Sequence, residues 1–293
     1  MKVLDGVVLK KKILADLNQD IDELYQKHNK RPGLAVVLVG DNPASQVYVS
    51  MKKKACESIG IDSVEHVLPA STTAESLKDL LESLNQDEAV HGILLQLPLP
   101  DHLNADDMIQ AISPKKDVDG LHPENIGKVL LGLDAFRSCT PYGVLKLMEF
   151  YDIDPSGKHV VIVGRSNLVG KPLAAMLIQK ASPGNATVTV CHSRSENLAD
   201  ITRSADILIP AIGRPEFITA DMVKEGAVVI DVGINRIDDS SRKTGYRLVG
   251  DVDYDNVSLK ASAITPVPGG VGPMTIAMLL DNTLKAAQYM AAI

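Results

Sequence analysis

The chain has 293 residues, a formal net charge of -7 and a hydrophobic fraction of 45%. This length suits one large or two ordinary domains, and we expect two. The negative charge, the lack of tryptophan and the 3% of aromatic residues argue against nucleic acid as a partner. No apolar run reaches the roughly 18 residues that a membrane helix needs, so we expect a soluble protein with no membrane partner.

The first residues, Met1–Gly6, lack the apolar core of a secretory signal, so we expect a cytoplasmic protein. Three cysteines at wide spacing, Cys56, Cys139 and Cys191, suit reduced thiols in packed cores better than disulfides or a zinc cluster. The histidines do not have the spacing of metal ligands, and no metal is expected.

Apolar runs alternate with amphipathic helical stretches along the chain, which is typical of an α/β fold. The runs that we expect to form buried strands are Leu34–Val39, Gly92–Leu97, Val160–Val163, Thr187–Cys191, Ile207–Ile209 and Val228–Val232. The turn-rich segment Asp152–Gly157 separates the second domain's sheet from what precedes it.

A helix is predicted after the first strand, where Asn42 can cap it and Pro43 can occupy its first position, and Gly60 is expected to end it. Tyr48 and Lys52 are four residues apart and therefore share one helix face, so a phenol and an ammonium point together. The alternative is a packing role for Tyr48 and a solvated lysine face.

Polar residues follow the next apolar strand. Gln96 lies at its carboxyl end, where α/β proteins place ligand-binding groups and where it could orient the amine of Lys52 and stabilise its neutral form. It could instead bond a neighbouring backbone group. Asp117 and Asp119 then add two carboxylates in one loop, and the alternative for each is that it caps a turn.

The segment Val161–Pro172 predicts a strand that runs through a glycine turn into a helix, as in dinucleotide-binding proteins. The usual glycine pattern is displaced, since Gly170 comes one position late, and such a fingerprint alone is weak. Near the end, Thr265–Thr275 is predicted to be a rigid loop, followed by a helix over Ile276–Ala291.

Five motifs along the chain resemble those of the bifunctional methylenetetrahydrofolate dehydrogenase/methenyltetrahydrofolate cyclohydrolase family. They are Tyr48-Val-x-x-Lys52 with Lys54, Gln96-Leu-Pro-Leu99, Lys116-Asp-Val-Asp-Gly-Leu121, Val163-Gly-Arg-Ser-x-x-Val-Gly-x-Pro172 and Pro266-Val-Pro-Gly-Gly-Val-Gly-Pro-Met-Thr275. The resemblance covers essentially the full length, and the displaced glycine is the pattern that this family shows.

This resemblance implies two α/β domains flanking a cleft, the second a Rossmann-like doubly wound parallel sheet, with the C-terminal helix returning to the first domain. Residues 1–140 with 273–293 would form the folate-binding catalytic domain, and residues 141–272 the NADP-binding domain. A homodimer is also implied.

The implied activity is NADP-dependent oxidation of 5,10-methylenetetrahydrofolate to the methenyl compound, followed by hydrolysis to 10-formyltetrahydrofolate. Lys52 would relay protons for the attacking water, and Gln96 would orient the amine of Lys52. Tyr48 would line the folate site, and Asp119 would anchor the pterin. The residues that would also contact the substrate are Leu97, Pro268, Gly269, Gly270, Val271 and Gly272.

For the cofactor, the resemblance implies that Gly164, Arg165 and Ser166 contact the phosphates. Ser193 and Arg194 follow the next strand and offer donors and positive charge where an acidic residue would select NAD, so we expect NADP. An exposed surface position is the alternative for Arg194.

Ile234 would lie along the nicotinamide, and the alternative for this residue is ordinary strand packing.

Two other classes of protein remain possible from the residues alone: a dehydrogenase of amino-acid or shikimate type, and a folate- or nucleotide-binding protein without turnover. A member of the same family with dehydrogenase activity only is a narrower alternative.

Overall fold

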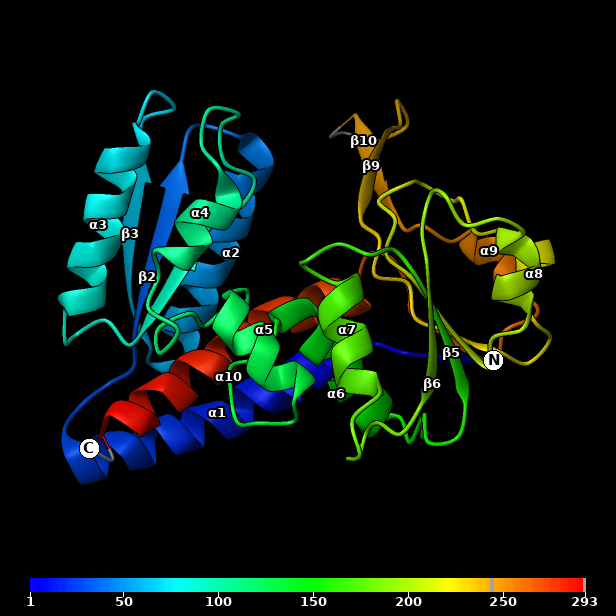
Figure 1. Ribbon diagram of the computed structural model, residues 1–293, viewed down its shortest axis with the longest axis horizontal. Helices are drawn as coiled ribbons and strands as arrows, with labels where there is room; N and C mark the ends of the chain where they lie inside the picture. The colour runs from blue at the N-terminus through cyan, green and yellow to red at the C-terminus, as the bar shows by residue number, and fades with distance from the viewer. Residues whose placement is uncertain (243–244, 292–293) are drawn as a thin grey trace. The chain divides into compact units, whose positions relative to one another are not determined.

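Two parallel sheets organise the chain, one in each of two units (Figure 1). The computed structural model describes residues 1–242 and 245–291. The three-stranded unit consists of Lys12–Lys128, Asp134–Cys139 and Ile276–Ile293, and the six-stranded unit consists of Met1–Lys11, Val129–Leu133 and Thr140–Thr275. The expected α/β class with parallel sheets is confirmed.

The three-stranded unit contains a parallel sheet in the order β3-β2-β4. Its elements are α1 (Gly6–His28), β2 (Gly33–Val39), α2 (Pro43–Ile59), β3 (Asp62–Leu68), α3 (Ala74–Gln86), β4 (Gly92–Leu95), α4 (Ala105–Gln110), α5 (Pro123–Leu130) and α10 (Val271–Ala291). Helices α1 and α10 begin in the six-stranded unit and continue into this one, so the expected return of the C-terminal helix is confirmed.

Both faces of the three-stranded sheet are covered, which explains why every residue of the central strand β2 is buried. Ala35, Val37 and Val39 share a core with Leu77 and Leu81 of α3. Successive strand residues point to opposite faces, so the alternate residues of β2 face the other side. Figure 1 shows α3 and α2 on opposite sides of β2.

Helix α2 begins and ends where the sequence predicts. The side chain of Asn42 accepts hydrogen bonds from the backbone N–H groups of Ala44 and Ser45, and Pro43 occupies the first helical position. Gly60 closes the helix in the left-handed conformation, with φ at 78°. These caps set the register of the helix face that carries Tyr48 and Lys52.

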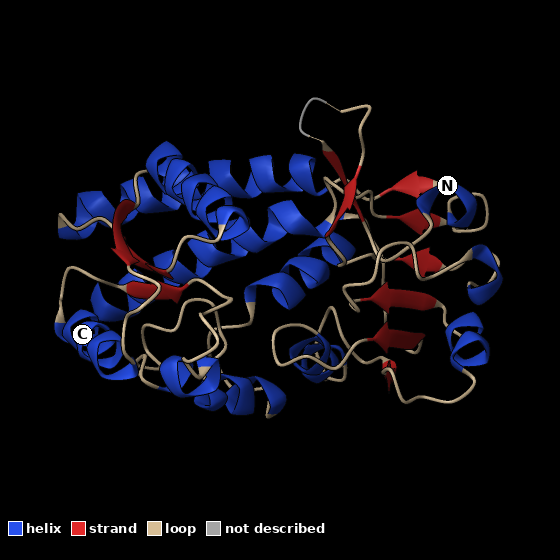
Figure 2. Cartoon of the chain, turned by 90° about the horizontal axis from the view of Figure 1, so that it is seen from above, coloured by secondary structure: helices blue, strands red, loops and turns tan. Residues whose placement is uncertain are grey.

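The six-stranded unit has a parallel sheet in the order β1-β11-β8-β7-β5-β6, whose strands lie in a row in Figure 2. Its elements are β1 (Lys2–Val3), α6 (Cys139–Phe150), β5 (His159–Val163), α7 (Gly170–Leu177), β6 (Thr187–Cys191), α8 (Leu198–Arg203), β7 (Ile207–Pro210), η1 (Ala220–Met222), β8 (Val228–Val229), β9 (Asn235–Asp238), β10 (Tyr246–Val249), α9 (Tyr254–Val257) and β11 (Ala263–Ile264). The strand order changes direction between β5 and β7, as in a doubly wound Rossmann-like sheet, so the predicted arrangement is confirmed.

Met1–Lys11 lie in the six-stranded unit because β1 pairs in parallel with β11. The functional domain boundaries expected from the sequence remain a prediction. Residues 292–293 of the first expected domain and 243–244 of the second lie outside the described residues.

Some strand ends differ from the sequence prediction. Strand β8 stops at Val229 rather than Val232. On the β11 side the backbone N–H of Asp231 donates to the hydroxyl of Thr265, although Val232 still donates to the β7 carbonyl oxygen of Pro210. Strand β4 stops at Leu95, two residues before Leu97. The sequence prediction missed β3, whose exposed edge position leaves it without a continuous apolar run.

The predicted loop over Thr265–Thr275 is wrong in its second half, because α10 already begins at Val271. Pro273 does not prevent this, since the N–H that proline lacks has no intrahelical partner in a first turn. Val271 and Gly272 therefore lie on the first turn of a helix.

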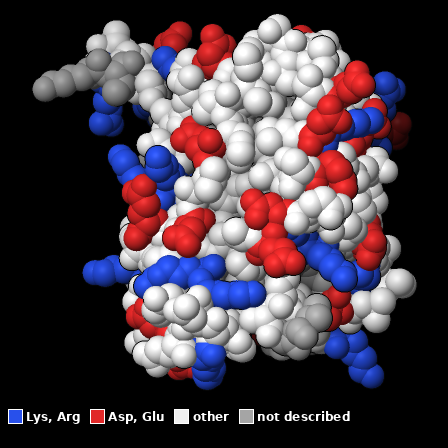
Figure 3. Space-filling model, turned by 90° about the vertical axis from the view of Figure 1, so that its left-hand side faces the viewer, with Lys and Arg blue, Asp and Glu red and all other residues white. Residues whose placement is uncertain are grey.

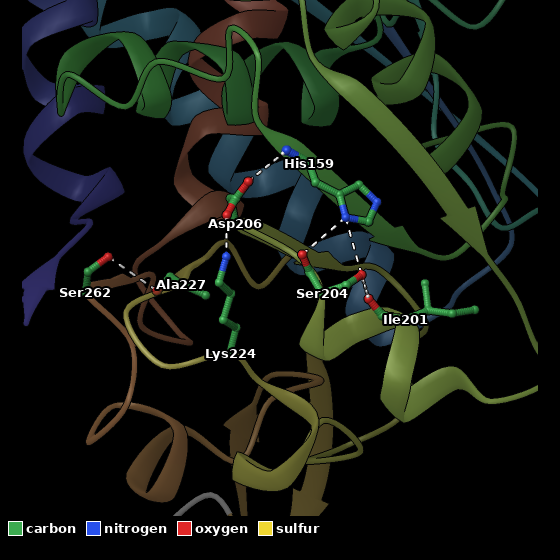
Figure 4. Close-up of polar contacts among 7 residues, drawn as sticks. All are labelled: His159, Ile201, Ser204, Asp206, Lys224, Ala227 and Ser262. Atoms are coloured by element: carbon green, nitrogen blue, oxygen red, sulfur yellow. Dashed lines mark hydrogen bonds and ion pairs between the residues drawn. The ribbon is translucent and has the colours of Figure 1, made fainter.

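A polar network closes the amino-terminal edge of the six-stranded sheet (Figure 4). Asp206 accepts the backbone N–H of His159 at 3.0 Å and the Nζ of Lys224 at 2.6 Å. The His159 ring lies 2.9 Å from Thr189 Oγ1 and 3.2 Å from the carbonyl oxygen of Ser204. A surface depression of about 410 Å³ adjoins this edge. Because these groups satisfy one another, we interpret the network as structural.

Cys56, Cys139 and Cys191 are buried free thiols, which confirms the packing role expected for them.

Among residues 1–242 and 245–291, none of the helices combines the length and apolarity needed to cross a bilayer. Acidic and basic side chains are interspersed on the face shown in Figure 3.

Candidate active site

Lys52 is a buried lysine on α2, with only 7% of its surface exposed. Its Nζ donates a hydrogen bond to Oε1 of Gln96 at 2.9 Å. Burial lowers the pKa of Lys52, while the charge of Asp119 acts in the opposite direction. A lysine that is driven toward its neutral form can accept a proton, which a solvated lysine at neutral pH cannot do.

Gln96 follows the last residue of β4 and joins Lys52 to the strand end. Its Nε2 donates to the carbonyl oxygen of Leu97 at 2.6 Å, which turns its Oε1 toward Lys52. Gln96 therefore has both of the roles considered for it: it bonds a neighbouring backbone group, and it also orients the amine of Lys52. An accepting carbonyl favours the ammonium at least as well as the amine, so the preference for neutral Lys52 comes from burial.

Tyr48 is half-buried one turn before Lys52 on α2. Burial raises its pKa, so the phenol keeps its proton and remains available as a hydrogen-bond donor. Lys54, by contrast, is exposed, as expected for a lysine on the solvated face of the helix.

The two carboxylates of the loop after β4 differ in their surroundings. Asp117 is buried and accepts hydrogen bonds from Leu121 N, His122 N and Asn125 Nδ2 at 2.8–3.1 Å. Burial raises the pKa of Asp117 to about 6. Asp117 thus has the turn-capping role that was its alternative, while Asp119 is half-buried.

Sequence reasoning missed Asn282, a buried polar residue on α10. Its Nδ2 lies 2.8 Å from the carbonyl oxygen of Val118 and 2.9 Å from that of Arg137. It also lies 3.7 Å from Sγ of Cys139, a thiol whose pKa burial raises. Asn282 therefore fixes the residue next to Asp119. An amide on the helix face of Met278, Leu279 and Ala286 was the signal that could have revealed it.

In the six-stranded unit, the displaced glycines have a geometric cause. Gly164 follows β5 with φ at 139°, and a Cβ there would overlap the carbonyl oxygen of Ala211. A Cβ at Gly170, the first residue of α7, would overlap the carbonyl oxygen of Gly164. The strand, the turn and the helix thus pack closely, and the turn lies at the start of α7, where backbone N–H groups can bind a pyrophosphate.

The other expected cofactor residues follow carboxyl ends of strands in the same sheet. Arg165 and Ser166 are exposed after β5, and Ser166 Oγ accepts the backbone N–H of Val169 at 3.1 Å. Ser193 and Arg194 are exposed after β6. These positions present two cations and hydroxyl groups at one edge of the sheet, and they fit a phosphorylated dinucleotide.

Ile234 is 39% exposed, so simple strand packing does not describe it. A Cβ at Gly272 would come within 3.2 Å of Ile234 Cδ1. The structure therefore brings an expected cofactor residue next to an expected substrate residue. Pro268–Gly272 belong to the six-stranded unit, whereas Tyr48, Lys52, Gln96, Leu97 and Asp119 belong to the three-stranded unit.

The glycines of Pro268–Gly272 are needed partly for packing within the chain. Gly269 has φ at 111°, and its carbonyl oxygen accepts the backbone N–H of Gly6 at 2.9 Å. A Cβ at Gly270 would lie 2.6 Å from the carbonyl oxygen of Pro266. A side chain at Gly270 would therefore displace the loop itself.

Two family profiles match the chain. Residues 4–119 match the tetrahydrofolate dehydrogenase/cyclohydrolase catalytic domain, and residues 138–291 match the NAD(P)-binding domain of the same family. The second profile alone covers more than half of the 293 residues.

Similar proteins extend over the full length. A relative named bifunctional protein FolD, from Chlorobium phaeobacteroides (strain BS1), is 57% identical over 98% of this chain and 97% of its own. The crystal structure of the bifunctional FolD enzyme from Campylobacter jejuni has a TM-score of 0.93 and 51% identity, and it covers 99% of both chains. The Trypanosoma brucei FolD structure, complexed with NADP cofactor and inhibitor, has a TM-score of 0.93 and 39% identity, with 98% and 97% coverage. The chain therefore belongs to the tetrahydrofolate dehydrogenase/cyclohydrolase family.

Proposed function

We propose that the chain oxidises 5,10-methylenetetrahydrofolate to 5,10-methenyltetrahydrofolate with NADP and then hydrolyses that product to 10-formyltetrahydrofolate. The observation that carries this proposal is the hydrogen bond from the buried Lys52 to the half-buried Gln96, in a chain that also has a close-packed glycine turn between β5 and α7. The lysine–glutamine pair suits proton transfer to and from water, and the glycine turn suits the dinucleotide.

The oxidation depends mainly on positioning. When bound, NADP accepts a hydride from the methylene carbon. The cation that remains is delocalised over two nitrogens, so the chain need not supply a strong base. Gly164, Arg165 and Ser166 would hold the phosphates, and Ile234 would lie along the nicotinamide.

The hydrolysis needs proton transfer. Water adds to the cationic methenyl carbon and gives one proton to the neutral amine of Lys52. The adduct's hydroxyl then loses the second proton of the water to solvent as the carbon–oxygen double bond forms. The bond from this carbon to N5 of the folate breaks, and N5 takes up the proton that Lys52 returns, so one proton is released overall. Gln96 orients the amine throughout, since its own amide is held by Leu97.

For substrate recognition we assign a role to each of the residues that the family resemblance implies. Asp119 binds the pterin, because its two oxygens can accept the ring N–H and the exocyclic amine together. Tyr48 and Leu97 line the folate site, and the backbone of Pro268–Gly272 approaches the substrate closely. We assign residues 1–140 with 273–293 to the folate domain and 141–272 to the NADP domain.

We assign NADP rather than NAD because Ser193 and Arg194 stand where an acidic residue would select NAD. We further propose a homodimer, as the family resemblance implies. A cytoplasmic location is supported by Cys56, Cys139 and Cys191, which are free thiols of the kind kept reduced in that compartment.

The proposal is tested with a spectrophotometric assay of the purified protein with methylenetetrahydrofolate and NADP or NAD, and with the methenyl compound alone. Lys52→Met is compared with Lys53→Met, which replaces an exposed lysine on the same helix. We expect NADP reduction and methenyl hydrolysis by wild type, and loss of hydrolysis in Lys52→Met only. NADP reduction without hydrolysis by wild type would support a dehydrogenase-only enzyme, and neither reaction would refute the proposal.

A further inference from the structure

Asp251 is a fully buried carboxylate at the carboxyl edge of the six-stranded sheet. Its Oδ2 accepts the backbone N–H groups of Ile212 at 2.6 Å and Gly213 at 3.0 Å. Its Oδ1 accepts the backbone N–H of Arg214 and Nδ2 of Asn235, both at 2.9 Å. One side chain thus fixes the loop that follows β7 and the first residue of β9.

Asp231, a second buried carboxylate, holds Asp251 in place. Its oxygens accept the backbone N–H groups of Gly233, Asp251 and Val252 at 2.9–3.1 Å. Its own backbone N–H donates to Oγ1 of Thr265 at 2.7 Å. The two aspartates therefore connect the segments that follow β7, β8 and β11.

Glycines opposite the two aspartates make this arrangement possible. A Cβ at Gly233 would overlap the carboxylate of Asp251, and a Cβ at Gly250 would overlap Oδ2 of Asp231. Each aspartate therefore occupies space that a side chain on the other segment would fill. This reciprocal packing gives the two segments one relative position.

The segments fixed in this way flank an expected cofactor contact. Ile234 lies between Gly233, which donates to Asp231, and Asn235, which donates to Asp251. The loop over Ile212–Arg214 follows β7, the strand next to β5 at the point where the strand order changes direction. Dinucleotides bind at such a point in open α/β sheets.

We propose that Asp251, held by Asp231, is a positioning residue for the dinucleotide, setting Ile234 and the loop after β7 against its nicotinamide half. This inference rests on the cofactor site proposed above. Asp251 itself need not touch the cofactor, since its four hydrogen bonds are made within the chain.

The chemistry of the site requires a carboxylate. Two oxygens accept four N–H groups, whereas an amide of the same shape has one oxygen and turns an NH₂ group toward two of those donors. Asp251→Asn should therefore shift the loop or Asn235 with little change in volume. Asn235→Ala removes one donor and leaves the charge of Asp251, so it is the milder variant.

The test compares Asp251→Asn and Asn235→Ala with Asp255→Asn, an exposed aspartate on α9. Each protein is assayed for the KM of NADP in the dehydrogenase reaction and for hydrolysis of the methenyl compound, which uses no NADP. We expect Asp251→Asn to raise the KM of NADP on the order of tenfold or more, because small misplacements near reacting groups are costly. Asn235→Ala should act in the same direction by less, and Asp255→Asn should match wild type.

The hydrolysis rate separates positioning from simple loss of folding. A raised KM of NADP with hydrolysis preserved in the same preparation supports the proposal. A proportional loss of both activities in Asp251→Asn and Asn235→Ala, or an unchanged KM in both, would overturn it. Ser193→Glu serves as the reference for the cofactor site: if it weakens NADP binding while Asp251→Asn does not, this inference fails and the proposed site stands.

Discussion

The buried Lys52 is paired with the half-buried Gln96, and the lysine Nζ lies 2.9 Å from the glutamine Oε1. The glutamine cannot simply rotate, because its Nε2 is bonded to the carbonyl oxygen of Leu97. The orientation of the amine is thus tied to the backbone directly after β4, where the N–H of Gln96 donates to the carbonyl oxygen of Val37 in β2 at 2.9 Å.

Replacing Gln96 should impair hydrolysis more than oxidation. In Gln96→Ala the amine of Lys52 loses its acceptor and its fixed direction, so methenyl hydrolysis should fall on the order of 100-fold, as for a displaced general base. The dehydrogenase rate should fall less, since hydride transfer needs no proton acceptor. Initial rates of both reactions check this, with Gln110→Ala on the exposed side of α4 as the control. Equal losses in the two reactions would contradict it.

Hydrolysis should also rise with pH. Burial lowers the pKa of Lys52 below the ordinary lysine value of 10.5. Protonated Lys52 cannot accept a proton from water, so the rate should increase as pH rises through this lowered pKa. A pH–rate profile of methenyl hydrolysis measures the effect after correction for the uncatalysed reaction. The increase of the rate with pH should be absent from the profile of Lys52→Met. An increase that persists in this variant would assign the titration to another group.

The sequence was sufficient to predict the elements whose physics is local. Apolar runs marked the buried strands, and Asn42, Pro43 and Gly60 marked the ends of α2, because a cap acts within one helical turn. The α/β class followed from the alternation of strands and helices, whereas the doubly wound sheet was implied by the family resemblance. The sequence prediction missed edge strand β3, because its exposed and half-exposed positions leave no continuous apolar run.

Contacts between distant segments could not be predicted in this way. Asn282 and Val118 are 164 positions apart, and the local sequence pattern of α10 does not indicate which carbonyl group Asn282 binds. Asp231 and Asp251 resemble ordinary turn residues until the fold places one against the other. The start of α10 at Val271 was missed because glycine and proline normally indicate a loop.

Asn282→Ala should weaken folate binding. It removes one buried N–H donor from the carbonyl oxygens of Val118 and Arg137, which costs about 1–3 kcal/mol of unfolding free energy. The Val118 oxygen keeps the weak S–H donor of Cys139 at 3.3 Å. Because Val118 precedes Asp119, the KM of the folate substrate should rise in both reactions while the KM of NADP is kept. Gln288→Ala, exposed on the same helix, is the control. A rise in the KM of NADP alone would contradict this role.

Cofactor choice should depend on Arg194. Arg194→Glu places a negative charge beside the position assigned to the 2'-phosphate of NADP, so the kcat/KM for NADP should fall on the order of 10-fold or more relative to NAD. Steady-state kinetics with both cofactors check this. Lys180→Glu makes the same change of net charge at another exposed position and should leave the ratio unchanged. An equal effect of both variants would indicate only a change in long-range charge.

Asp231 should give the fold a distinctive dependence on pH. Burial, with the charge of Asp251, raises the pKa of Asp231 from 3.8 to about 7, although three backbone N–H groups act against this. Between these two values the folded chain retains a proton that the unfolded chain has released. The free energy of unfolding should therefore decrease as pH rises from about 4 to about 7, by at most about 1.4 kcal/mol per pH unit for this group, and then level off.

Other groups titrate in the same interval, so the prediction concerns a difference between proteins. Burial lowers the pKa of His91, which contributes a slope of opposite sign, and Asp117 adds one of the same sign below about 6. Both contributions cancel when wild type is compared with Asp231→Asn by urea denaturation at pH 5, 6, 7 and 8. The stability advantage of wild type over this variant should shrink as pH rises to 7, while Asp255→Asn should parallel wild type. An advantage that grows over this interval would mean that the N–H donors outweigh burial and keep Asp231 ionised.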